Sequence, residues 1–99
     1  MNAFENRLGM EGPQNFRGLV GNLVEGSDLF PIKTIGKNEQ MTILDAIENN
    51  EVSLYVPERA DDKMLDAVHC LVTIYDELKK QEPDQDFITS TVKQLKEYL

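Results

Sequence analysis

Ninety-nine residues, 40% of them hydrophobic, suffice for one modest core, so we expect a single domain over 1–99. Acidic residues exceed basic ones by 18 − 10 = 8, which disfavours direct binding to nucleic acid or an anionic membrane, and no stretch approaches the roughly 18 apolar residues of a membrane span. One cysteine, Cys70, allows no intrachain disulfide and no multi-cysteine zinc site, which indicates a reducing compartment and therefore the cytoplasm.

The first third of the chain predicts an arm and one helix. Residues 1–12 mix apolar and polar types without a period, which is typical of a loosely ordered arm. From Pro13 to Gly26 apolar residues recur at helical spacing, at Phe16, Leu19, Val20, Leu23 and Val24. The glycines inside this helix, Gly18 and Gly21, each cost about 1 kcal/mol relative to alanine, so the helix must depend on tertiary contacts.

The middle of the chain predicts an extended segment followed by a helix. Leu29–Ile35 is expected to be extended, and Pro31 restricts any strand there to an edge because proline cannot donate to a sheet. A helix is expected from Asn38, a residue type that caps helices well, to about Asn49. Its buried face is expected at Met41, Leu44 and Ile47.

The clearest predicted strand is Val52–Val56. Its apolar and polar positions alternate, with Val52, Leu54 and Val56 on one face and Ser53 and Tyr55 on the other. Two short strands are only marginally stable as an isolated sheet. We therefore expect this strand to be covered by helices or to offer an open edge to a partner.

The remaining residues, 61–99, predict an antiparallel helical hairpin. The first helix, from about Asp61 to Gln81, has apolar residues at alternating steps of four and three, at Met64, Val68, Leu71, Tyr75 and Leu78. Three further residues widen that stripe, so we expect it to contact more than one element: Leu65, Val72 and Ile74. The second helix follows Pro83, with its apolar face at Ile88, Val92, Leu95 and Leu99. The whole pattern predicts a mainly α fold with a small β element (α+β).

Three side chains on the first hairpin helix form a weak candidate metal site. Asp62, Asp66 and His69 lie at i, i+4 and i+7, which places two carboxylates and an imidazole along one face. A divalent ion would need ligands from another helix, and a solvated acidic face explains the spacing more simply. His69 and Cys70 point about 100° apart on a helix, so we expect no nucleophile paired with a base, no catalytic residue and no cofactor.

Acidic residues of the middle segment suggest two alternative functions. Asp45 and Glu48, with Glu58 and Asp61 further on, resemble the acidic pairs with which helical nucleotide pyrophosphatases hold magnesium around a phosphate chain. The second pair straddles the end of the predicted strand, so the family is not assigned, and a metal-dependent nucleotide hydrolase is one alternative. The other is an inhibitor in which Asp45, Glu48 and Glu51 imitate a phosphate backbone and occupy a nucleic-acid-binding protein.

The leading hypothesis is a non-enzymatic regulatory or interaction protein. It would bind a protein with a basic surface, or its own copy as a homo-oligomer, through the helical hairpin or the Val52–Val56 edge. The expected contact residues are Leu54, Tyr55, Tyr75 and Tyr98, with Asp45, Glu48 and Glu51 giving specificity.

Overall fold

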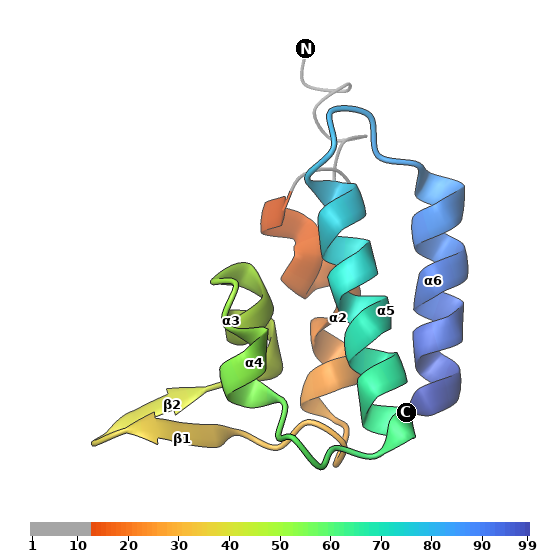
Figure 1. Ribbon diagram of the computed structural model, residues 1–99. Helices are drawn as coiled ribbons and strands as arrows, with labels where there is room; N and C mark the ends of the chain where they lie inside the picture. The colour runs from red at the N-terminus through yellow and green to blue at the C-terminus, as the bar shows by residue number, and fades with distance from the viewer. Residues whose placement is uncertain (1–12) are drawn as a thin grey trace.

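The computed structural model of this chain describes residues 13–99, and the arm expected over 1–12 lies outside them. Its elements follow in the order η2 (Pro13–Asn15), α2 (Phe16–Glu25), β1 (Lys33–Gly36), β2 (Glu39–Met41), α3 (Ile43–Glu48), α4 (Val52–Tyr55), α5 (Asp62–Leu78) and α6 (Gln85–Tyr98) (Figure 1). This order confirms the predicted mainly α fold with a small β element. Within the described part, no helix combines the length and apolar character needed to cross a membrane.

Helix α5 is the centre of the fold. It pairs with the antiparallel α6 and also contacts α2, η2 and α3 (Figure 1). The helical hairpin and the contact of α5 with several elements are therefore both confirmed. The largest fully buried side chains come from every part of the helical body: Tyr55, Phe16, Ile43, Leu44, Leu71, Ile74, Leu78, Ile88, Leu95 and Val20.

Aspartate side chains mark the start of both hairpin helices. The carboxylate of Asp61 accepts a hydrogen bond from the backbone N–H of Met64 at 2.8 Å, and Asp84 accepts one from Phe87 at 3.1 Å. Such N-caps satisfy backbone donors that the first helical turn leaves unpaired. The predicted starts at Asp61 and after Pro83 are therefore close to the observed ones.

Glu77 joins the end of α5 to the start of α6. Its buried carboxylate accepts the backbone N–H of Asp84 at 2.9 Å and forms an ion pair with Lys80 at 3.0 Å. The hydrogen bond from Asp84, followed by that from Lys80, lowers the pKa of Glu77. The turn between the helices is therefore held by an ionised side chain.

The predicted start of the middle helix at Asn38 is wrong. Asn38 lies in the turn between β1 and β2 with φ of 72°, a conformation that asparagine tolerates better than most residues. The two strands pair antiparallel, with Lys33 opposite Met41. Helix α3 begins later, where Thr42 and Asp45 form a reciprocal capping box with hydrogen bonds of 3.1 and 3.2 Å.

The predicted strand at Val52–Val56 is wrong as well, because this segment forms the one-turn helix α4. The preceding helix α3 ends in a Schellman motif: Asn50 has φ of 59°, and the backbone N–H of Glu51 donates to the carbonyl of Ala46 at 2.7 Å. The chain then turns back on itself, and Val52, Tyr55 and Val56 occupy i, i+3 and i+4 facing the protein. Val52–Val56 therefore offers no sheet edge.

Tyr55 links α4 to the segment that leads into β1. Its side chain is fully buried, and its hydroxyl donates to the carbonyl of Pro31. The ammonium of Lys33 donates to the carbonyl of Tyr55 and lies 5.3 Å from the centre of its ring. Burial raises the pKa of the Tyr55 hydroxyl to about 12, so it stays protonated and able to donate.

Removing only the hydroxyl should weaken this link. We expect Tyr55→Phe to lower the free energy of unfolding by about 1 kcal/mol, because the hydrogen bond to Pro31 is lost while the ring still fills the core. Urea denaturation measures the change. Tyr75→Phe, which removes the hydroxyl of a half-buried ring, is the matched control and should have a smaller effect. Equal stability of Tyr55→Phe and the unmodified protein would contradict the prediction.

Protonation of Glu77 at low pH should lower the free energy of unfolding, because it weakens the contact between the end of α5 and the start of α6. Its pKa in the folded protein lies below the ordinary value of 4.5, so its stabilising effect is complete above about pH 4.5 and disappears as the pH falls through the lowered pKa. We expect Glu77→Gln to flatten the fall in unfolding free energy below that pH, measured by urea denaturation across a pH series. Glu97→Gln, at an exposed acid of α6, should keep the original profile.

Candidate interaction surface

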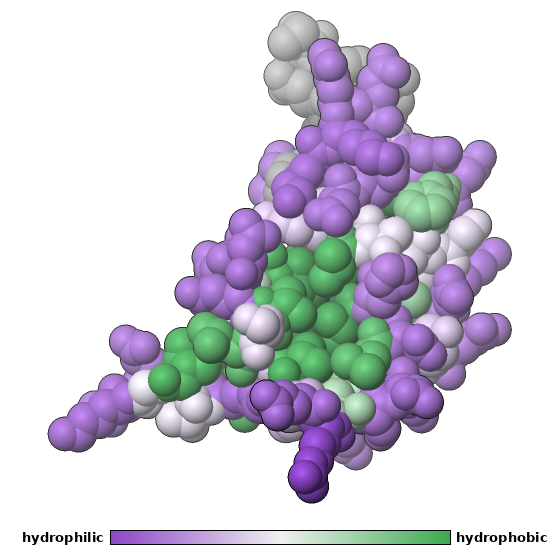
Figure 2. Space-filling view, viewed as in Figure 1, coloured by the Kyte–Doolittle hydropathy of each residue, from purple (hydrophilic) through white to green (hydrophobic). Residues whose placement is uncertain are grey.

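An apolar surface extends across α4 and the adjoining side of α5. Figure 2 shows it as a continuous green area that reaches the base of the β hairpin. Leu54 of α4 is 61% exposed and Leu65 of α5 is 45% exposed. We call this surface the α4–α5 face and define it by the exposed or half-buried apolar side chains of the two helices: Val52, Leu54, Met64, Leu65 and Val72.

Helical geometry explains why α5 contributes to this face. Leu65 and Val72 lie seven residues apart, which is nearly two full turns, so they point to the same side of α5. Neighbouring elements cover the rest of the apolar stripe, because α6 packs on one flank of α5 and α2 and α3 pack on the others. The part of the stripe at Leu65 and Val72 is left at the surface.

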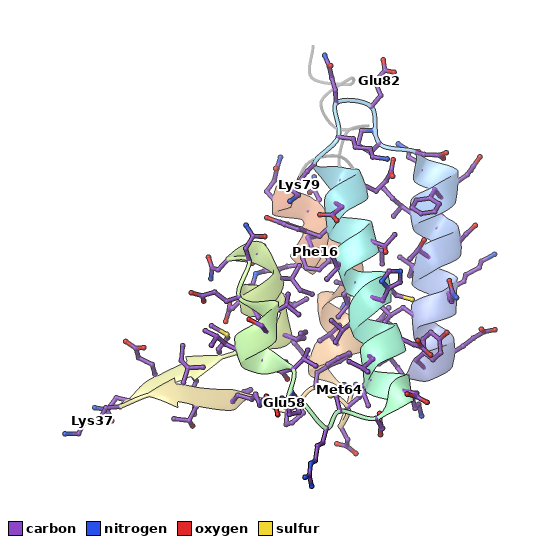
Figure 3. All side chains as sticks on the ribbon, in the orientation of Figure 1. Phe16, Lys37, Glu58, Met64, Lys79 and Glu82 are labelled. Atoms are coloured by element: carbon purple, nitrogen blue, oxygen red, sulfur yellow. The ribbon has the colours of Figure 1, made fainter. Side chains whose placement is uncertain are left out.

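Acidic side chains border the α4–α5 face. The segment from 48 to 62, which surrounds α4, carries five acids and one base, Arg59. On α5, Asp62 and Asp76 lie three or four residues from Leu65 and Val72 and are exposed. Figure 3 shows Glu58 and Met64 together at the lower end of α5 and Lys79 at its upper end. The apolar face is therefore surrounded by more negative than positive charge.

Two of the three carboxylates expected to give specificity are paired with an arginine. Arg17 of α2 donates through Nε to Glu48 at 2.9 Å and through its second guanidinium nitrogen to Asp45. Burial opposes ionisation of Asp45, but hydrogen bonds from Thr42 and Arg17 outweigh it and lower the pKa of Asp45. Asp45 and Glu48 therefore share one positive charge, which leaves only half-buried Glu51 of the predicted trio away from Arg17.

The weak candidate metal site stays spread along α5. Asp62, Asp66 and His69 are all exposed, and no three His, Cys, Asp or Glu side chains among residues 13–99 lie close enough to hold a metal ion. Asp66 and His69 instead line a groove of about 270 Å³ between α5 and α6, whose lining is part polar and part apolar. Cys70 lies in the same groove and is almost buried; burial, followed by the charge of Asp66, raises its thiol pKa. A raised pKa disfavours a thiolate nucleophile.

The four expected contact residues lie in different environments. Leu54 is exposed on the α4–α5 face, whereas Tyr55 is buried and has no surface to offer a partner. Tyr75 is half-buried, with its ring centre 5.0 Å from that of Phe16, and Tyr98 is half-buried at the groove between α5 and α6. The structure therefore brings only Leu54 of the four onto the α4–α5 face as an exposed side chain.

Removing Arg17 should change the ionisation of the carboxylates with which it pairs, Asp45 and Glu48. We expect Arg17→Ala to raise the pKa of Asp45, because it removes a hydrogen bond and a nearby positive charge, as measured by NMR titration of the carboxyl carbon. The loss of stability should stay below about 1 kcal/mol and shrink with added salt, because the pair is about 40% exposed. Arg59→Ala, which makes the same change in net charge, should leave Asp45 nearly unaffected. An equal shift in both variants would contradict the pairing.

Comparison with known proteins provides no information on the function of this chain. Protein-family models, curated proteins and solved structures all give no match to this chain. The surface features that could serve a function are an exposed apolar face, its acidic border and the groove between α5 and α6.

Proposed function

We propose that this protein is a non-enzymatic interaction protein that binds a protein partner through the α4–α5 face. The observation that supports the proposal is the apolar area over α4 and α5 (Figure 2), together with the exposure of Leu54 on α4 and Leu65 on α5. Single exposed leucines are common on protein surfaces, whereas contiguous apolar areas with a polar border are typical of interaction sites. Burial of this area by a partner would remove its apolar side chains from water.

The chemistry of the nearby groups favours binding over catalysis. The raised pKa of Cys70 keeps its thiol protonated, and the preceding residue, His69, is exposed. Asp45 and Glu48 are paired with Arg17, which makes them poor ligands for a magnesium ion and poor imitators of a phosphate backbone. A metal-dependent hydrolase and a nucleic-acid mimic therefore have less support than a binding protein.

The helical face is also a better docking surface than the edge of the β hairpin. Strand β1 has four residues and β2 has three, so either edge offers few hydrogen bonds. Lys33 lies within β1 and Lys37 follows it. Short strands and lysines are common means by which proteins keep sheet edges from pairing. This comparison favours the α4–α5 face as the contact surface.

Replacing the exposed leucines should abolish the interaction. We expect the double substitution Leu54→Ser with Leu65→Ser to lower the free energy of unfolding by only about 1 kcal/mol, because the two residues are 61% and 45% exposed. We expect the protein to retain a specific partner in affinity purification from its native cell, and the double variant to lose at least about 90% of it.

Phe87→Ser, which alters an exposed apolar residue of α6, is the matched control and should retain the partner. Light scattering of the purified protein tests the same variants for self-association. A strictly monomeric protein that captures no partner, or a partner retained equally by the double variant, would overturn the proposal.

A further inference from the structure

We infer that the segment bound on the α4–α5 face is an amphipathic helix with basic flanks, supplied by another protein. This inference rests on the proposed function and adds the shape and the charge of the partner. Two properties of the face carry it: the helical spacing of Leu65 and Val72 on α5, and the sign of the charges around them.

The spacing on α5 fits a helix that packs alongside it. Exposed Leu65 and half-buried Val72 lie at i and i+7 and mark a strip about 10 Å long on one side of α5. A strip with this period is the surface that a second helix meets with its own i, i+3 or i+4, and i+7 side chains. Leu54 of α4 is 61% exposed and offers a further apolar contact on the α4–α5 face. The partner segment therefore needs about two or three helical turns.

The charges select a basic partner. Asp76 forms an ion pair with Lys79 at 3.4 Å, so it contributes less to the border than the remaining acids. Asp62 and Glu58 are exposed and form no ion pair with any residue from 13 to 99. Lysine or arginine residues flanking the apolar side of a docked helix would meet these carboxylates. Such complementarity speeds association and excludes acidic competitors.

The same charges argue against a second copy as the occupant. Each copy carries a net charge of −8, and two copies joined face to face would bring their acidic borders together. Like charges across an interface are destabilising, and the repulsion adds to the cost of association. The occupant is therefore a basic segment of a different protein.

Three synthetic peptides test the inference on the full chain. The first is an amphipathic helix of leucine and lysine about 18 residues long, the second replaces lysine with glutamate, and the third scrambles the first so that its composition is kept and its apolar side is lost. Isothermal titration calorimetry measures the affinities. We expect the first peptide to bind at least about tenfold more tightly than either of the others and to weaken as salt is added.

Matched variants locate the binding. Leu54→Ser with Leu65→Ser should reduce affinity for the first peptide at least about tenfold, and Glu58→Gln with Asp62→Asn should reduce it severalfold. Phe87→Ser and Asp86→Asn, at exposed positions of α6, make the same kinds of change elsewhere and should leave binding intact.

The possible results separate this inference from the proposed function. Equal binding of the scrambled or the glutamate peptide, or no effect of the Leu54 and Leu65 substitutions, overturns the inference. A dimer that Leu65→Ser dissociates assigns the face to a second copy and also overturns it. If the leucine variant loses its cellular partner while the leucine and lysine peptide fails to bind, the inference fails and the proposed function stands.

Discussion

The structure depends on helix α5, whose apolar stripe is wider than any one neighbour covers. Antiparallel α6 buries one side of it, and α2 with α3 buries another (Figure 1). A chain of this size has few remaining elements with which to cover the rest. The uncovered part, at Leu65 and Val72, is therefore a direct consequence of the packing that stabilises the fold, and it becomes the centre of the α4–α5 face.

Long, regular elements were predictable because their patterns repeat over several turns. The stripe from Met64 to Leu78 and the apolar spacing after Pro83 were sufficient to predict the hairpin and the contact of its first helix with several elements. The short middle elements were harder, because five residues fit more than one period. Val52–Val56 alternates as a strand does, yet Val52, Tyr55 and Val56 also lie on one side of a helical turn. The Schellman motif at Asn50 and the burial of Tyr55 decide in favour of the helix.

Some features of the candidate site were also predictable from the sequence, whereas others depend on contacts between distant residues. Exposure of part of the α5 stripe follows from its width, which is visible in the sequence as the additional apolar positions Leu65 and Val72. The pairing of Asp45 and Glu48 with Arg17 joins residues 28 and 31 positions apart, and no local pattern predicts it. The same holds for the burial of Tyr55, which depends on a hydrogen bond to Pro31, 24 positions away.

The acidic surface and the apolar face are best understood together. An exposed apolar area promotes unspecific self-association, because any copy of the protein could bury it. Net negative charge opposes that association between identical chains, while it attracts a segment of opposite charge. Pairing of Asp45 and Glu48 with Arg17 removes part of this charge beside α3, whereas Asp62 and Glu58 stay in solvent near the face. The charge that remains unpaired thus lies where it can exclude a second copy and select a basic helix.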